Sequence, residues 1–429
     1  MNPTQNDKQT SLPANNQRPK LIAMYFPQLH AIPENDTWWG KGFTDWDNVK
    51  KAKPQFEGHY QPRVPLGDNY YDQSKQETLR WQIDLAKTHN IYGFCHYHYW
   101  FDGKQLLETP TNLIMENKEF DFPFCLSWAN ETRSRRWDAQ EHQVLIKQTH
   151  PPTKDSWKRH YDYLIRAWKD PRAIKVDGKP MFVIYRPQRI DKINDMLAYW
   201  RELALGDGLP GLYFIYQMQY ELQREVRLES LESFDAAFQF QPFEAIYSPA
   251  YHKTSLIYKT FKLLPDDKQD IYRNFRARFY KSFTFTFNKT SIHQSVLFKF
   301  YTLLSEHVQN RLHSFKASYV KNLTFHDYDT IWKLITEIRT DEKLTIYPGA
   351  FVDWDNSARY KKRATLFKGA SPQSFEKWFS TLVATMPQRN LPENFIFLNA
   401  WNEWSEGTYL EPDEKFGHQY IQAIKKVLG

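Results

Sequence analysis

The chain has 429 residues, of which 41% are hydrophobic and 25% are charged. This composition supplies a large packed core and excludes general disorder, and the absence of any run of 18 apolar residues excludes a membrane-spanning helix. The two cysteines are too few for a disulfide framework or a structural zinc site. The formal net charge of +7 is concentrated in residues 245–325, which hold 13 Lys and Arg against four acidic residues. The basic character therefore belongs to one segment rather than to the whole molecule.

From the N-terminus onward, the chain divides into a polar leader and a long region of alternating patterns. Residues 1–19 are polar and predict a disordered leader without the apolar segment of a secretion signal, so we expect a cytoplasmic protein. Short apolar runs then predict strands at residues 20–26, 91–99, 122–128, 181–185, 212–217, 234–240, 345–352 and 394–401. Amphipathic stretches predict helices at residues 74–89, 154–169, 191–205, 371–386 and 416–428.

Eight strands with intervening helices predict an α/β fold, a (β/α)8 TIM barrel, over residues 20–429. A doubly wound open sheet is the alternative. Aromatic residues make up 17% of the chain, glycine is scarce, and neither a dinucleotide-binding nor a P-loop motif is present. Abundant Trp and Tyr suit a site that stacks sugar rings, although they also suit a large core.

Active sites of such barrels lie where the strands end and the βα loops begin. Acids, amides and aromatic residues crowd these positions in the predicted first, second, third, seventh and eighth units. They are Trp46, His98, Tyr99, Trp100, Trp128, Asn130, Glu131, Asp353, Trp354, Asn402, Glu403 and Glu406. This clustering is hard to explain as core packing.

Several blocks of this sequence resemble the WbsX-like proteins of polysaccharide biosynthesis loci, which are related to glycoside hydrolase family 99. The resemblance runs from residue 20 to about residue 418. It is carried by YFPQLH at 25–30, WWGKGFT at 38–44, FEGHYQPR at 56–63, FCHYHYWF at 94–101, WANE at 128–131, DN at 355–356 and WNEWSEG at 401–407. It implies a barrel fold. Members are often called glycosyltransferases, whereas family 99 enzymes are retaining endo-acting α-mannosidases or mannanases.

Glu403 and Glu406 are the catalytic candidates. Cleavage of a glycosidic bond needs one carboxyl that protonates the leaving oxygen and a second group at the other face of the sugar. Mutual repulsion and partial burial would raise the pKa of one member of the pair. The resemblance implies that Glu403 deprotonates the substrate 2-hydroxyl to give a 1,2-anhydro sugar, and that Glu406 protonates the leaving group. The other interpretation is that one glutamate caps the last helix.

The remaining candidates each have a second interpretation. Glu131 can bind a sugar hydroxyl or pair with Arg135 or Arg136. The aromatic candidates can be stacking platforms or core residues. His96 and His98 share a strand face without a third ligand at a suitable spacing, so we expect neither a metal nor another cofactor. The Asp353–Asp355 spacing is like the Asp-x-Asp of metal-dependent transferases, but those enzymes use an open nucleotide-binding sheet.

Residues 245–325 interleave 17 aromatic residues with basic ones and predict a largely helical subdomain inserted between the sixth and seventh strands. It can contact an acidic glycan, or the inner membrane surface where a lipid-linked glycan is held, or it can be merely solvated. No nucleic-acid-binding motif accompanies its charge, so nucleic acid is not an expected partner.

The sequence thus predicts a retaining, metal-independent glycoside hydrolase acting on an α-linked bacterial polysaccharide or O-antigen-type glycan. The alternative is a glycosyltransferase of lipopolysaccharide or capsular polysaccharide biosynthesis. A carbohydrate-binding protein without catalysis is a third interpretation, which the Glu403 and Glu406 pair disfavours.

Overall fold

The computed structural model describes residues 18–135, 140–219, 231–248, 250–251, 323–338 and 344–429. The predicted leader and the predicted subdomain at 245–325 therefore fall almost wholly outside the described residues.

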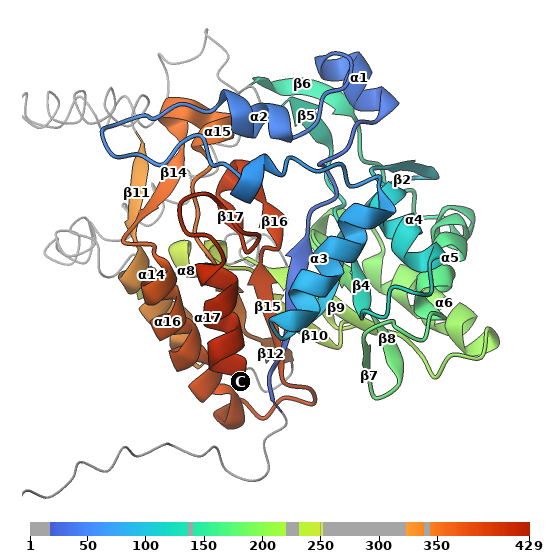
Figure 1. Ribbon diagram of the computed structural model, residues 1–429. Coiled ribbons are helices and arrows are strands. Elements are labelled where there is room, and N and C mark those ends of the chain that lie inside the picture. The colour runs from blue at the N-terminus through green and yellow to red at the C-terminus, as the bar shows by residue number, and fades with distance from the viewer. Residues whose placement is uncertain (1–17, 136–139, 220–230, 249, 252–322, 339–343) are drawn as a thin grey trace, which may run out of the picture.

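A parallel barrel forms the centre of the molecule (Figure 1). Its strands are β1 (Lys20–Tyr25), β2 (Ile91–Phe101), β4 (Phe124–Trp128), β8 (Lys179–Ile184), β9 (Tyr213–Met218), β10 (Ala236–Gln239), β12 (Thr345–Tyr347), β13 (Gly349–Phe351) and β15 (Phe395–Asn399). Each pairs with its neighbours in parallel, in the order β12-β10-β9-β8-β4-β2-β1-β15-β13.

The sheet closes because β12 and β13 are two halves of one predicted strand, divided at Pro348. The first half pairs with β10 and the second half pairs with β15. Proline has no N–H to give to a neighbouring strand, but its carbonyl accepts a hydrogen bond from Phe397 N at 3.1 Å. The (β/α)8 prediction is confirmed, and the open doubly wound sheet is wrong.

Helices cover the outside of the barrel (Figure 1). They are α3 (Gln76–Thr88), α4 (Thr109–Glu116), α5 (Lys154–Trp168), α6 (Ile193–Gly206), α14 (Tyr328–Thr336), α16 (Pro372–Ala384) and α17 (Gln419–Leu428). The helices α5 and α16 begin where Thr153 and Ser371 accept hydrogen bonds from the N–H groups of Ser156 and Ser374. The five predicted helices are all present, whereas α4 and α14 were not predicted.

Shorter elements form the loops, and most of those after the strands gather at the upper end of Figure 1. The helical ones are α1 (Pro33–Trp39), α2 (Trp46–Lys51), η1 (Leu66–Asp68), η3 (Pro187–Arg189), α8 (Phe243–Ile246), α15 (Ser357–Tyr360), η6 (Lys361–Arg363), η7 (Met386–Gln388) and η8 (Trp404–Glu406). The strands are β3 (Lys104–Leu106), β5 (Arg133–Arg135), β6 (Gln140–Ile146), β7 (Lys175–Val176), β11 (Thr324–Asp327), β14 (Thr365–Lys368), β16 (Asn402–Glu403) and β17 (Thr408–Tyr409).

The core has two parts, one inside the barrel and one between the barrel and its helices. The inner part contains Ile22, Cys95, Val183 and Phe397, and the outer part contains Phe94, Leu126, Phe182 and Trp200. Both cysteines are free and buried, and they lie side by side in register on β2 and β4. Strands buried on both faces explain why their sequences are continuously apolar rather than alternating.

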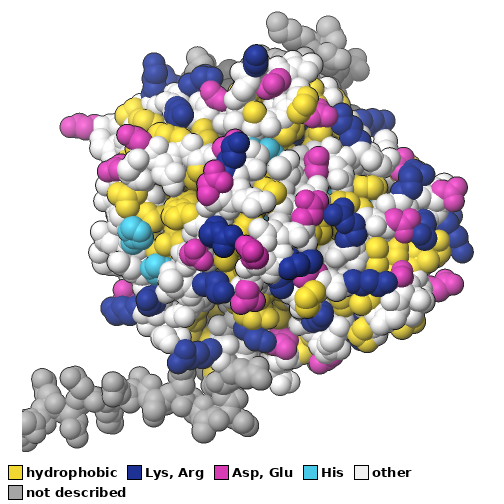
Figure 2. All heavy atoms as spheres, turned by 45° about the vertical axis from the view of Figure 1, so that its right-hand side comes forward, with side chains coloured by type: hydrophobic (Ala, Val, Ile, Leu, Met, Phe, Trp, Pro, Cys, Tyr) yellow, Lys and Arg dark blue, Asp and Glu magenta, His cyan; other side chains and the backbone are white. Residues whose placement is uncertain are grey.

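One face of the outer surface is mixed in charge (Figure 2). On the face in Figure 2, basic and acidic side chains are interspersed, with smaller apolar areas between them. None of the described helices combines the length and the hydropathy that a bilayer crossing requires.

Gly349 provides a test of barrel closure. A Cβ atom at this position would lie 1.7 Å from the carbonyl oxygen of Gln239, which belongs to the neighbouring strand β10. We expect Gly349→Ala to lower the free energy of unfolding by about 3 kcal/mol or more, measured by urea denaturation. Gly206→Ala is the matched control, because a Cβ there meets no atom within 4 Å. Equal stability of the two variants would contradict the close approach of β10 and β13.

Candidate active site

The loop that follows β15 is fixed to the first barrel strand. The side-chain oxygen of Asn402 accepts from Phe26 N at 2.8 Å, and its amide nitrogen donates to Phe26 O at 3.1 Å. The loop then turns at Gly407, where φ is +67° and a Cβ would lie 2.9 Å from Asp355 N. Asn402 is fully buried and positions the loop that carries both candidate glutamates.

Arg359 on α15 joins the two glutamates. One guanidinium nitrogen lies 2.8 Å from Glu403 Oε1 and 3.0 Å from Asp45 Oδ2, and the other lies 2.5 Å from Glu406 Oε1. Ser405 also donates to Asp45, at 2.5 Å. The loops after β1, β13 and β15 therefore meet at the carboxyl end of the barrel.

The side chains of this cluster are buried to different extents. Exposure is 0% for Asp45, 6% for Arg359, 9% for Glu403 and 20% for Glu406. Glu406 is therefore the carboxyl most open to a ligand or to water. Asp45 and Arg359 were not predicted as site residues, because their roles depend on contacts with distant parts of the chain.

Burial raises the pKa of Glu403 well above its ordinary value, and the charges of Glu406 and Asp45 act in the same direction. Burial also raises the pKa of Glu406, again supported by the charge of Asp45. The positive charge of Arg359 opposes both shifts but does not cancel them. Both shifts favour the protonated carboxyl, which is the form that a general acid requires.

Two tyrosines of β2, Tyr97 and Tyr99, lie close to Glu403. Its charge contributes to the raised pKa of both Tyr97 and Tyr99, for which burial is the main cause. Both side chains are partly exposed. The hydroxyl of Tyr99 accepts a hydrogen bond from Gln28 at 2.8 Å. Tyr99 was predicted as a substrate contact, whereas Tyr97 was missed although the two-residue period of the strand places both on one face.

Asp353 and Asp355 lie at the end of β13 and bind side chains from the loop at 59–63. Arg63 lies 2.8 Å from Asp353, while His59 and Gln61 each lie 2.8 Å from Asp355. Burial raises the pKa of Asp353. Burial opposes ionisation of Asp355 too, but the hydrogen bond from His59 and the charge of Arg63 lower its pKa to about 2. Both carboxyls are buried and held by this loop.

Asn130 and Glu131 both contact Arg186 after β8. Asn130 pairs with the backbone of Arg186 through two hydrogen bonds of 2.7 and 2.8 Å. Glu131 lies 3.0 Å from the Arg186 guanidinium and 3.5 Å from that of Arg189. Arg186 also donates to Gln219 at 3.0 Å. Glu131 therefore forms ion pairs, as one of its two interpretations predicted, but the partners observed are Arg186 and Arg189, whereas Arg135 and Arg136 were predicted.

Four of the five predicted stacking aromatics are packed in the interior. Trp46 packs on Trp404, and its indole donates to the Tyr71 carbonyl at 2.8 Å. Trp354 contacts Phe243 edge to face. Trp100 and Trp128 are joined by a 3.1 Å hydrogen bond from the Trp128 indole to the Trp100 carbonyl.

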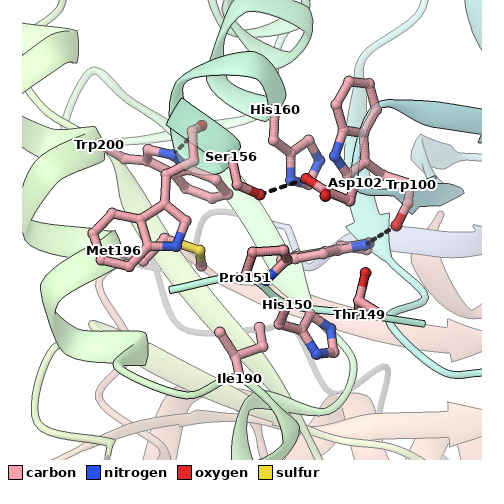
Figure 3. Close-up of a pocket in the computed structure, with 12 residues that line it drawn as sticks. Trp100, Asp102, Thr149, His150, Pro151, Ser156, His160, Ile190, Met196 and Trp200 are labelled. Atoms are coloured by element: carbon pink, nitrogen blue, oxygen red, sulfur yellow. Dashed lines mark hydrogen bonds between the residues drawn. The ribbon is translucent and has the colours of Figure 1, made fainter. Parts of the chain in front are cut away.

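His98 belongs to the same packed region, with its Nε2 atom 2.9 Å from Nε2 of His160. Trp100 and Trp128 line a cavity of about 20 Å³ beside His160 (Figure 3). This is the volume of roughly one water molecule and not of a sugar ring. These buried side chains pack in the interior of the protein. Of the five predicted stacking aromatics, Tyr99 is the one whose side chain stays partly exposed, and it lies beside the glutamates.

A further carboxyl, Glu411, is buried beside the loop that carries the glutamates. It accepts hydrogen bonds from Tyr71 at 2.6 Å, Gln82 at 2.7 Å and the Trp404 indole at 2.7 Å. Burial raises its pKa to about 7, although the three donors favour the anion. The sequence around Glu411 does not indicate that it is buried and hydrogen-bonded, because its three donors come from separate segments of the chain.

The comparisons with known proteins agree with the sequence blocks. A model of the family described as glycosyltransferase WbsX matches residues 21–424. Two proteins of Xanthomonas campestris pv. campestris, from two strains and both called uncharacterized protein WxcX, are each 31% identical over 414 residues. The alignment covers 95% of this chain and 49% of each relative, so the chain spans about half the length of the curated relatives it matches.

Solved structures with the same fold include one described as a glycoside hydrolase-like protein, with a TM-score of 0.51 at 11% identity over 98% of this chain and 97% of that chain. This likeness shows the fold. Two structures of a GH99 endo-α-mannosidase from Bacteroides thetaiotaomicron have a TM-score of 0.46, at 13% and 12% identity. They align over 95% of this chain and 94% and 95% of theirs.

The raised pKa of Glu411 predicts a pH-dependent stability. Since the folded chain holds a proton on this carboxyl between about pH 4.5 and 7 and the unfolded chain does not, its contribution to stability falls as pH rises through that window. We expect Glu411→Gln to gain up to roughly 3 kcal/mol in the free energy of unfolding, relative to the wild type, between pH 4.5 and 7.5. Urea denaturation of both proteins across this range measures the difference. Glu77→Gln on α3 is the control, and a constant difference for Glu411→Gln would contradict the assignment.

Proposed function

The chain belongs to the WbsX family, and from that premise we propose that it is a retaining, metal-independent glycoside hydrolase acting on an α-linked bacterial polysaccharide or O-antigen-type glycan. Family membership makes it a carbohydrate-active enzyme, a statement that covers both hydrolysis and transfer. The observation that carries the proposal is the pair of Glu403 and Glu406, held by one arginine at the carboxyl end of the barrel. Two such carboxyls beside one sugar ring are what glycosidic cleavage requires.

In the proposed reaction, Glu403 removes the proton of the substrate 2-hydroxyl, and the resulting oxygen attacks the anomeric carbon. The bond to the leaving oxygen breaks as Glu406 donates its proton there, which leaves a 1,2-anhydro sugar. Glu406 then takes a proton from water, whose oxygen opens the anhydro ring at the anomeric carbon, and Glu403 returns its proton to the 2-oxygen. Two inversions give net retention.

The different exposures of the two glutamates support this division of roles. Glu406 is the more exposed carboxyl, so it can reach both the leaving oxygen and the incoming water. Its ion pair with Arg359 would stabilise the carboxylate once the proton has left. Glu403 is deeper and lies beside Tyr97 and Tyr99, which we propose as contacts for the sugar bound there.

Transfer of a sugar to a growing lipid-linked glycan is the second candidate function, favoured by the description of the family as glycosyltransferases. The same glutamates would serve if a sugar hydroxyl replaced water as the acceptor. In that case the net charge of +9 in residues 245–325 would suit the anionic surface where such a substrate is held. Lipopolysaccharide or capsular polysaccharide would then be the product.

Product release from a panel of α-linked bacterial glycans tests the hydrolase. Without added nucleotide sugar, the wild type should release reducing ends, and Glu403→Gln and Glu406→Gln should each lower the rate by about 10²–10⁴-fold. The control is Glu376→Gln, which alters a surface ion pair with Lys426 on the outer helices. No release from any glycan, together with thermal stabilisation by a nucleotide sugar, would exclude hydrolysis and favour transfer.

A substrate with a better leaving group distinguishes the proposed acid, Glu406, from the proposed base, Glu403. When the substrate is an aryl glycoside of an acidic phenol, the phenolate leaves without needing a proton from the enzyme. On that substrate, Glu406→Gln should therefore release the phenol at nearly the wild-type rate. Glu403→Gln should not recover, because the attacking oxygen still needs a base. Recovery of both variants, or of neither, would refute the assignment.

Arg359 should set the pH range of the reaction. Removal of its positive charge takes away the interaction that lowers the pKa of both glutamates. We therefore expect Arg359→Gln to move both limbs of the kcat/KM profile to higher pH, and Arg359→Lys to move them less. A melting curve of each variant confirms that it is folded. An unchanged profile with lower activity would mean that the arginine acts on geometry alone.

A further inference from the structure

A second cavity, of about 250 Å³, lies outside the Glu403 and Glu406 cluster. It is lined by Pro65, Leu66, Asn69, Tyr71, Trp81, Trp404, Pro412 and His418. We call it the Trp81 cavity. Its volume is more than ten times what one water molecule needs, so it can hold a group of the size of a sugar ring.

The frame of the Trp81 cavity is built by two loops that are bonded to each other. Leu66 N donates to the carbonyl of Pro412 at 3.0 Å, and Glu414 N donates to that of Val64 at 2.9 Å. The Gly67 N–H donates to the Glu414 carboxylate at 2.6 Å. These bonds connect residues more than 340 positions apart, so the cavity is a product of the fold rather than a gap between independent loops.

The lining combines aromatic faces with neutral polar groups. The rings of Tyr71 and Trp81 lie 5.6 Å apart, and Trp81 on α3 is partly exposed. Asn69 is exposed and His418 is partly exposed at the rim. Among the described residues that line the cavity, none is lysine, arginine, aspartate or glutamate.

These features select one class of ligand. The flat rings offer an apolar face, and the amide and imidazole offer hydrogen bonds, which together match the apolar face and the hydroxyl edge of a pyranose. A phosphate or a nucleotide would find no cation among the described lining residues. We propose that the Trp81 cavity is a second, non-catalytic binding site for a neutral sugar residue of a glycan.

The cavity shares Trp404 with the loop that carries the two glutamates. The Trp404 ring stacks on Tyr409 at 3.8 Å, and its indole donates to Glu411, so it is rigidly held. A glycan bound at the Trp81 cavity would therefore anchor one part of a polymer near the loop that acts on another part. This step rests on the proposed function, whereas binding at the cavity does not.

Calorimetric titration with neutral α-linked oligosaccharides tests the site. The probes are maltohexaose and α-1,6-mannohexaose, with an α-linked galacturonic acid hexamer as the charged comparison, and Glu406→Gln is the background that blocks turnover. Trp81→Ala should remove one binding event per chain, or weaken it at least tenfold. Asn69→Ala changes an exposed side chain without touching the core and should weaken the same event. Trp378→Ala, at a partly exposed tryptophan of α16, is the matched control and should leave binding unchanged.

The outcomes distinguish this proposal from the catalytic one. Binding that depends on Trp81 in a chain that cleaves no glycan would support the site and refute the hydrolase. If the wild type cleaves a glycan but Trp81→Ala and Asn69→Ala bind the oligosaccharides as tightly as the unsubstituted background, the proposed binding site is wrong and the hydrolase proposal stands. The absence of saturable binding by either neutral hexasaccharide would also overturn it. On a polymer, Trp81→Ala should raise KM at least threefold and leave kcat on a short aryl glycoside unchanged.

Discussion

The buried guanidinium of Arg359 is the interaction on which the rest of the site depends. It contacts Asp45, Glu403 and Glu406, which come from segments that are 44–314 residues away in the chain. Its charge permits three acids to share a nearly water-free space at the barrel end. Arg133 is also near, since the charges of Asp45 and Arg359 act on its pKa, which burial lowers to about 10. Among the described residues of the cluster, three carboxyls meet two guanidinium groups, and burial together with the neighbouring acids raises the pKa of Glu403.

The other buried carboxyls show how strongly their surroundings decide ionisation. Asp355 has a histidine and an arginine as partners, and its pKa is lowered to about 2. Glu411 has only neutral donors, and its pKa is raised to about 7. The catalytic candidates combine an arginine with neighbouring acids, and their pKa values are raised. One end of the barrel thus holds carboxyls whose pKa is lowered and carboxyls whose pKa is raised, which is the condition for dividing acid and base roles between chemically identical groups.

The aromatic residues separate into two populations. Most of the tryptophans named in the sequence are packed beneath the site, where they fix the strand ends and loops that carry the polar groups. A smaller set, including Tyr97, Tyr99 and Trp81, keeps part of each side chain exposed. The first set makes the site rigid and the second is available to a ligand. The high aromatic content therefore supplies both a large packed core and partly exposed rings that a ligand can contact.

Much of the fold could be predicted from the sequence, because it depends on local patterns. Eight apolar runs of strand length predicted the barrel strands, since parallel strands are buried on both faces whichever neighbours they have. Glu403 and Glu406 could be identified because they lie three residues apart at the end of one strand. The division of the seventh strand at Pro348, the bridging role of Arg359 and the burial of Trp46, Trp100, Trp128 and Trp354 could not. Those features arise from contacts between segments far apart in the chain, and a side chain's own neighbours in sequence do not specify which distant groups will pack against it.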